Sequence, residues 1–271
     1  MFKQYAGAGL NSLNYGGQMI ETLIFALGLN IAMFLVAFYK KTDKLTDISY
    51  AVTFAGIVLF GAFKNEMSSA QWVVTAITIF WSVRLGSYLL YRIHVIGRDK
   101  RFDEMRQSFW KFGRFWVLQG LTAWIVLLPA SFLLQTNAVT RLSTVVIIGA
   151  LISVFGIVFE GISDIQKFNF IQDKSNKGKW IESGLWKFSR HPNYFGEILT
   201  WVGVYIVSYT WLEGNKVYLG LIGPIFISII LIFVSGIPIL EKGADKRWGE
   251  DRKYQEYKMR TSVLIPFFNK R

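Results

Sequence analysis

Residues 217–240 read VYLGLIGPIFISIILIFVSGIPIL, a run that contains no Asp, Glu, Lys or Arg. About 20 apolar residues allow a helix to cross the hydrocarbon core of a bilayer, so this run predicts a membrane-spanning helix. Six other apolar stretches come near that length, at residues 21–39, 48–63, 72–90, 115–134, 142–159 and 194–212. The sequence therefore predicts an all-α polytopic membrane protein with about seven transmembrane helices.

The composition agrees with that fold class and argues against several kinds of site. Of the 271 residues, 52% are hydrophobic and 17% aromatic, which is unusual for a soluble domain. The chain has no cysteine, which excludes disulfides, thiolate metal ligands and cysteine nucleophiles. Its two histidines, His94 and His191, are too few for a His-rich metal centre. We expect no metal.

The basic residues are distributed unevenly between the two sides of the predicted spans. The N-terminal tail and alternate loops carry Lys3, Lys64, Arg141 and Lys216, whereas the other loops and the C-terminal tail carry 25 Lys and Arg, and Arg84 lies inside a span. The positive-inside rule then places the N-terminus outside and the C-terminus in the cytoplasm. The net charge of +12 is accounted for by topology and by contact with anionic lipids, so we expect no nucleic-acid partner. No repeat or linker divides the chain, which indicates one integral-membrane domain over residues 1–271.

Polar residues are concentrated where the sixth predicted span begins, in residues 183–201 (SGLWKFSRHPNYFGEILTW). Pro192 suits the first turn of a helix, whose free N–H groups carry positive potential. Arg190 and His191 beside that end are unfavourable unless an anion binds, so we infer an anion site. Asn193, Glu197 and Trp201 follow at helical spacing on one face.

A matching polar face is predicted at the end of the fifth span. Glu160, Asp164 and Lys167 fall at positions i, i+4 and i+7 of one helix. The two carboxylates are suited to accept hydrogen bonds from ribose hydroxyls or an amide, or to pair with neighbouring basic residues. Basic residues at a helix end also serve as lipid anchors, but Asn193 and Glu197 are not needed for anchoring.

The third span carries a second polar group. Trp81, Arg84 and Tyr88 share a helix face, and we expect Arg84 to form an internal ion pair. Asn30 in the first span is a weaker signal of the same kind. The sequence contains no phosphate-binding loop and no dinucleotide fingerprint. Any nucleotide would therefore be held by the membrane helices and their loops.

Three motifs resemble a known superfamily: SDIQKFNF (163–170), GLWKFSRHPNYFGE (184–197) and YQEYKMRTSVLIPFF (254–268). They resemble the steroid 5-alpha-reductase family, especially its uncharacterised bacterial branch. They are also similar to the delta-14 and delta-7 sterol reductases. Isoprenylcysteine carboxyl methyltransferases share the RHP-x-Y-x-G element and the pattern of the tail. The resemblance makes residues 160–271 the cofactor-binding half and points to a bacterial cytoplasmic membrane.

The resemblance implies an enzyme in which NADPH, bound at the cytoplasmic side, delivers a hydride to a carbon–carbon double bond of a lipophilic substrate taken from the bilayer. The cofactor-binding residues that carry over are Asp164, Lys167, Arg190, His191, Asn193, Tyr194, Glu197 and Tyr257. Glu197 would assist catalysis, and Tyr50 or Tyr88 would supply the proton. Trp81, Arg84 and Trp201 are assigned to the substrate side.

The sequence departs from the reductases at two places. The tyrosine that polarises a steroid ketone is replaced by Trp81, and between the first two spans only Asp43, Asp47 and Tyr50 could assist, so a steroid-like, isoprenoid or fatty enone stays open as the substrate. Near Glu241 an apolar residue replaces the basic one that binds the adenosine phosphate in the reductases. The choice between NADPH and NADH as the cofactor therefore stays open. Two alternatives remain: an S-adenosylmethionine-dependent methyltransferase acting on a lipophilic acceptor, and a non-catalytic protein that binds membrane lipids.

Overall fold

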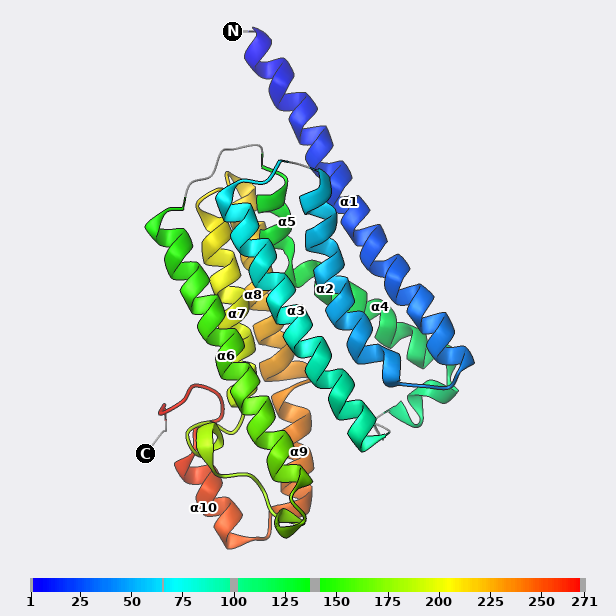
Figure 1. Ribbon diagram of the computed structural model, residues 1–271, viewed down its shortest axis with the longest axis vertical. Helices are drawn as coiled ribbons and strands as arrows, with labels where there is room; N and C mark the ends of the chain where they lie inside the picture. Colours follow the sequence, from blue (N-terminus) through cyan, green and yellow to red (C-terminus); the bar gives the residue numbers. More distant parts are fainter. Residues whose placement is uncertain (1, 65, 98–101, 137–141, 269–271) are drawn as a thin grey trace. The chain divides into compact units, whose positions relative to one another are not determined.

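The computed structural model describes residues 2–64, 66–97, 102–136 and 142–268, and for residues 2–16 and 64 it describes the backbone alone (Figure 1). Within these ranges every regular element is a helix, and the only β feature is an isolated parallel bridge between Ser189 and Ser262. The prediction of an all-α chain is confirmed.

Ten α-helices lie in the described ranges, joined by short 3₁₀ turns and one π turn. They are α1 Phe2–Tyr39, α2 Lys44–Lys64, α3 Ser69–Ile96, α4 Phe109–Val126, α5 Leu128–Leu134, α6 Thr144–Gln172, α7 Pro192–Tyr209, α8 Asn215–Ile229, α9 Ile237–Trp248 and α10 Arg252–Arg260. The π turn, labelled η5, covers Ile230–Val234 between α8 and α9. All seven predicted apolar stretches fall mainly within these helices, and α7 begins at Pro192 as predicted.

Several of these helices are long and apolar enough to cross a membrane. Among the described residues there are five such segments: Gly17–Tyr39, Lys44–Phe63, Ser69–Ile96, Thr144–Gln172 and Asn215–Trp248. The number becomes six if α4 and α5, which bend by 55° at their junction, form one broken span. Pro129 near the start of α5 explains a break there, because proline cannot continue the hydrogen bonding of a preceding helix. The chain therefore has the helices of an integral membrane protein.

The finer topology stays a prediction. α7 is not among the segments that meet the length and hydropathy criteria, because its first two turns carry polar residues. Some of the basic residues on which the orientation depends lie outside the described residues, namely Arg98, Lys100, Arg101, Arg141, Lys270 and Arg271, and so do the side chains of Lys3 and Lys64. The seventh span and the cytoplasmic C-terminus rest on the sequence.

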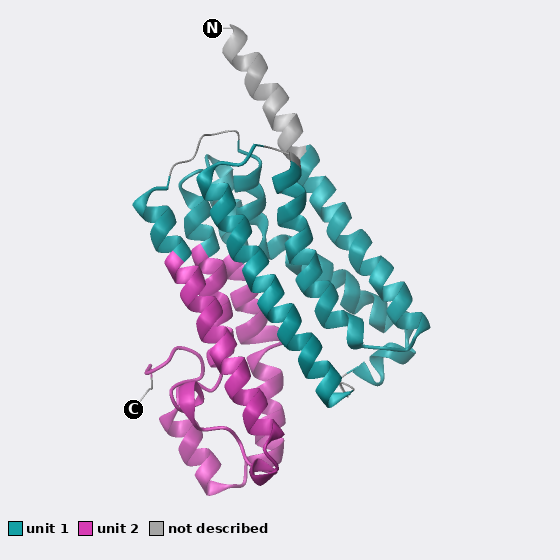
Figure 2. Cartoon of the chain, viewed as in Figure 1, with its two compact units in different colours: residues 1–150, 204–223 teal, residues 151–203, 224–271 magenta. Residues whose placement is uncertain are grey.

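The chain divides into two compact units (Figure 2). Unit 1 comprises residues 1–150 and 204–223, and unit 2 comprises residues 151–203 and 224–271. The boundaries fall inside α6, α7 and α8, so these three helices contribute to both units. The prediction of one domain over the whole chain stays a prediction, and each unit is described by itself.

Unit 1 packs α1, α2 and α4 around an aromatic core and a buried polar network. Phe34 of α1 and Phe112 of α4 meet edge to face, with ring centroids 5.9 Å apart. The Asn30 amide, fully buried, donates to Ala26 O at 2.8 Å and to Thr53 Oγ1 at 2.9 Å, and its oxygen accepts from Gln119 Nε2 at 3.0 Å. Every hydrogen-bonding group of Asn30 is thus used within the helix bundle, which gives this residue a structural role.

Unit 2 brings α6 and α7 into close backbone contact through two glycines. A Cβ on Gly156 would lie 2.5 Å from Gly196 O, and a Cβ on Gly196 would lie 2.6 Å from Glu160 N. Ser153 Oγ strengthens this contact by donating to Thr200 O at 3.0 Å. Small residues at a helix crossing allow such an approach. The consequence is that side chains at the end of α6 lie directly beside those at the start of α7.

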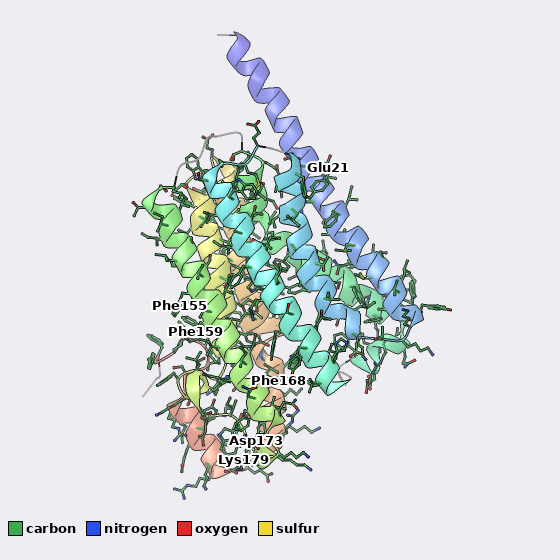
Figure 3. All side chains as sticks on the ribbon, in the orientation of Figure 1. Glu21, Phe155, Phe159, Phe168, Asp173 and Lys179 are labelled. Carbon is green, nitrogen blue, oxygen red and sulfur yellow. The ribbon has the colours of Figure 1, made fainter. Side chains whose placement is uncertain are left out.

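Aromatic side chains pack between α6 and α7 of unit 2 and also around α9 and α10. Figure 3 shows Phe155, Phe159 and Phe168 spaced along α6, and the Phe159 ring lies 5.6 Å from that of Phe195 on α7. Beyond α6, the rings of Trp180, Trp248 and Tyr254 form a cluster with centroids 5.3 to 6.1 Å apart. This cluster fixes α9 and α10 against the segment that follows α6.

Candidate functional site

The segment that leads into α7 is held by the C-terminal tail. Arg190 N donates to Ser262 O at 2.8 Å, and Ser189 Oγ donates to Leu264 O at 2.7 Å. Ser189 Oγ also accepts from His191 N at 3.1 Å. These bonds fix the backbone on either side of Arg190, so the directions of the Arg190 and His191 side chains are set by the fold.

Arg190 forms an internal ion pair. Its Nε and Nη2 donate to the two carboxylate oxygens of Glu241 at 3.2 and 3.0 Å, a bidentate geometry. Its Nη1 donates to the carbonyls of Lys258 and Thr261 at 2.8 and 3.3 Å. The inference that Arg190 needs an external anion is therefore wrong, because Glu241 of α9 supplies the negative charge.

His191 shares the same carboxylate and leaves one nitrogen without a partner. Its Nε2 lies 2.8 Å from Glu241 Oε1, and because a carboxylate can only accept, Nε2 carries the hydrogen. Burial lowers the pKa of His191 below its usual 6.5, and this effect exceeds the opposing one of Glu241. The ring is therefore neutral, and its Nδ1 is a buried acceptor that meets no donor among the described residues.

Asn193, the second residue of α7, presents a second buried acceptor. Its Nδ2 donates to Asp164 Oδ1 of α6 at 3.4 Å, whereas its Oδ1 is buried and meets no donor in the described part of the chain. An unsatisfied buried polar atom costs about 1–3 kcal/mol, so two of them at one helix start are not expected in a purely structural cluster. Both atoms are suited to accept hydrogen bonds from a bound molecule.

The predicted polar face of α6 is confirmed by its contacts. Asp164 meets Asn193, the backbone of Glu160 approaches Gly196, and the Lys167 ammonium lies 4.6 Å from the centre of the Trp186 ring. Glu160 and Asp164 are 3% and 8% exposed, so both carboxylates belong to the interior of unit 2. The structure thus places this face of α6 beside the start of α7, and the cofactor-binding roles of Asp164 and Lys167 stay predictions.

Two tyrosines support this group from the side. The ring of Tyr194 stacks on that of His191 with centroids 5.7 Å apart and planes 8° from parallel. Tyr257, predicted as a cofactor contact, donates its hydroxyl to Trp186 O at 3.0 Å, and burial raises its pKa. In this structure the Tyr257 hydroxyl holds the backbone before α7, which is a positioning role.

The other predicted residues lie on α7 and in unit 1. Glu197 is half-buried one turn beyond Asn193, and Trp201 is fully buried a turn later. In unit 1, Tyr50 of α2 and Trp81 of α3 meet edge to face at 6.2 Å, and Arg84 and Tyr88 are half-buried farther along α3. Tyr50 and Trp81 are therefore brought together, while the chemical roles assigned to these six residues stay predictions.

Sequence reasoning missed Glu241 as the centre of the charged cluster. Besides Arg190 and His191, Lys258 approaches it, with Nζ 3.6 Å from Oε2 and 2.6 Å from Asp245 Oδ1. Its position in the sequence could have indicated this role. Glu241 directly follows the apolar run that ends at Leu240, and a carboxylate at the end of a membrane span requires a partner.

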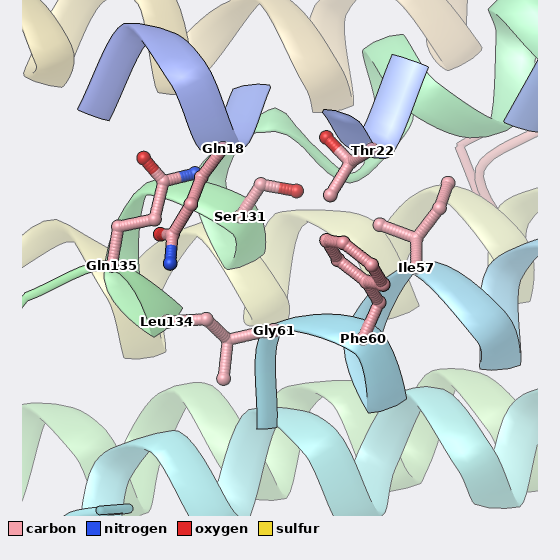
Figure 4. A pocket seen from close by; sticks show the side chains of 8 residues that line it. All are labelled: Gln18, Thr22, Ile57, Phe60, Gly61, Ser131, Leu134 and Gln135. Carbon is pink, nitrogen blue, oxygen red and sulfur yellow. The ribbon is translucent and has the colours of Figure 1, made fainter. Parts of the chain in front are cut away.

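A separate pocket lies in unit 1 and contains none of the predicted site residues (Figure 4). It is lined by Gln18, Thr22, Ile57, Phe60, Gly61, Ser131, Leu134 and Gln135. Ser131 Oγ and Gln135 Oε1 are buried and have no hydrogen-bond partner within the described ranges. The free volume of about 10 Å³ is enough for one water molecule.

The described side chains form no group of three or more ligating residues able to hold a metal ion.

Residues 33–261 match the family described as "Protein of unknown function (DUF1295)". The chain belongs to the DUF1295 family. This family is steroid 5-alpha-reductase-like, which supports the resemblance at the family level, while the particular branch stays a proposal. No curated protein and no solved structure matches the chain.

Proposed function

We propose that this DUF1295 protein is a membrane-embedded reductase that binds NADPH at the start of α7 and reduces a carbon–carbon double bond of a lipophilic substrate. The observation that carries the proposal is the pair of buried, unused acceptors, His191 Nδ1 and Asn193 Oδ1. When bound, NADPH would supply a hydride, with a proton from the enzyme completing the reduction.

The chemistry of the group fits a nucleotide that bears hydrogen-bond donors. A nicotinamide carboxamide and ribose hydroxyls both offer N–H or O–H groups to the acceptors of His191 and Asn193. The carboxylate of Asp164 accepts such donors as well, and the Lys167 ammonium suits a phosphate. Asn193 and Glu197 would orient the nicotinamide. The assignment of the proton donor to Tyr50 or Tyr88 stays a prediction from the sequence.

The Arg190–Glu241 pair bears on the main alternative. In a methyltransferase the RHP-x-Y-x-G element would hold the carboxylate of S-adenosylmethionine, which requires an available cation. Arg190 is instead engaged by Glu241 and two carbonyls. Arg190 is thus engaged whichever molecule binds, so Lys167 would have to supply the cation for a phosphate of NADPH or for the carboxylate of S-adenosylmethionine, and the ribose of either molecule would offer donors. The lipid-binding alternative predicts no nucleotide binding at all.

The experiment is a binding titration of the purified protein in lipid nanodiscs. NADPH fluorescence and calorimetry should detect NADPH binding, and calorimetry should detect none for S-adenosylmethionine. Asn193→Ala should weaken NADPH binding about tenfold, the effect of losing roughly 1.4 kcal/mol from one hydrogen bond. Asn169→Ala, at an exposed position of α6, is the matched control and should leave the affinity unchanged. Binding of S-adenosylmethionine alone, or of neither molecule, would overturn the proposal.

A further inference from the structure

The last described residues form a short apolar tail after α10. Residues 262–268 run beside the segment that precedes α7, where Ser262 pairs with Ser189 in a parallel bridge and Leu264 O accepts from Ser189 Oγ. The Phe267 ring packs on that of Phe188 with centroids 4.5 Å apart. The tail is therefore an ordered part of unit 2 with a fixed place near the start of α7.

This tail exposes apolar side chains although it lies outside the segments that can cross a membrane. Ile265 is 50% exposed, and Phe267 and Phe268 are 76% and 74% exposed. Exposed apolar residues on α1, α3 and α6 lie within segments that can cross a membrane, but the last such segment ends at Trp248. In water, two adjacent exposed phenylalanines would lose the stabilisation that burial of their rings gives.

The surroundings of the tail suit the interface between lipid and water. Ser189, which is hydrogen-bonded to Leu264 of the tail, lies three residues before the first residue of α7. From Pro192 to Ile198, where the apolar part of α7 begins, the helix rises by about 9 Å. That distance is comparable to the thickness of one headgroup layer. Aromatic side chains concentrate at this depth in membrane proteins.

Basic residues flank the tail on the side of Phe188. The exposed Lys187 has its ammonium 6.0 Å from the centre of the Phe188 ring, and the Arg260 side chain, 63% exposed, pairs with the exposed Glu182. A basic group beside an exposed aromatic ring is the combination expected where a protein meets anionic headgroups.

We propose that residues 263–268 insert their apolar side chains into the membrane interface and hold α10 at the membrane surface. The occupant of this surface is the lipid interface itself, and the inference is independent of the proposed reductase activity.

The cysteine-free chain allows a direct test with single spin labels. Phe268→Cys and Ile265→Cys are labelled in nanodiscs that each hold one protein and contain anionic lipid. Collisions with oxygen, which concentrates in lipid, are compared with collisions with a water-soluble nickel complex. Glu250→Cys, exposed between α9 and α10, is the aqueous reference, and Val154→Cys, exposed on α6, is the lipid reference.

Both tail labels should lose nickel collisions relative to residue 250 and gain oxygen collisions, with values between those of the two references. Nickel collisions as frequent as at residue 250 would overturn the proposal. So would protection from both reagents together with spin–spin broadening at higher protein loading, because that result would show the tail covered by a second copy of the chain.

Discussion

Two buried polar clusters in this protein differ in how completely their hydrogen bonds are used. In unit 1 the Asn30 amide donates to Ala26 O and Thr53 Oγ1 and accepts from Gln119. In unit 2, His191 and Asn193 each keep one buried acceptor for which the described residues offer no donor. A satisfied cluster stabilises a helix bundle by itself, whereas an incompletely satisfied one is stabilised by a molecule that supplies the missing donors. This difference is the reason why we propose the second cluster, and not the first, as a binding site.

The largest effect is expected for Glu241→Ala, which removes the shared partner of Arg190 and His191. Both side chains are largely buried, so an uncompensated guanidinium would remain and should lower the free energy of unfolding by about 3 kcal/mol. Thermal unfolding in detergent measures the change. Glu256→Ala, which breaks an exposed pair with Arg252, is the control and should cost less than about 1 kcal/mol. Equal effects of the two substitutions would show that the Glu241 cluster is not central to unit 2.

A smaller stability loss is expected in the cluster of unit 1. Asn30→Ala deletes three hydrogen bonds and should destabilise the protein by about 2 kcal/mol. NADPH affinity, measured at a temperature where the variant is folded, should not change. A loss of affinity equal to that of Asn193→Ala would erase the distinction between the two clusters.

Asn193→Ala should show the opposite pattern. It removes an unsatisfied oxygen, which stabilises the fold, and one long hydrogen bond to Asp164, which destabilises it, so the unfolding free energy should not decrease. NADPH affinity should fall about tenfold, as stated above. A substitution that destabilised the protein by as much as Asn30→Ala would indicate that the Asn193 oxygen has a structural partner.

The smallest effect concerns pH. The pKa of His191 is lower in the folded protein than its usual 6.5, so the unfolded chain binds more protons as the pH falls below about 6.5. Stability should therefore decrease with falling pH in that window. NADPH affinity should decrease as the pH falls through the folded pKa, because protonation turns Nδ1 from an acceptor into a donor. Chemical denaturation from pH 8 to 5 should show this slope in the native protein and a smaller one in His191→Gln; identical slopes would contradict the assignment.

Much of this fold could be predicted from the sequence because its signals are local. Apolar length predicted the helices, Pro192 predicted the start of α7, and helical spacing placed Asp164 on the polar face of α6. The bend between α4 and α5 also has a local signal, Pro129. The prediction of one apolar stretch over residues 115–134 did not use it.

The charged cluster could not be predicted because it depends on contacts between distant parts of the chain. Glu241 lies about fifty residues after Arg190, and no spacing rule connects α9 with the segment before α7. Without that partner, the sequence alone predicts an anion site at Arg190 and His191. The identity of the unused acceptors likewise depends on which atoms the fold leaves without donors, a three-dimensional property.

The most direct test of the account is an experimental structure determined with NADPH in the membrane. We expect donor groups of the nucleotide within about 3 Å of both His191 Nδ1 and Asn193 Oδ1, with the Arg190–Glu241 pair retained. A nucleotide bound elsewhere, with both acceptors satisfied by water or by other protein groups, would contradict the assignment of this site.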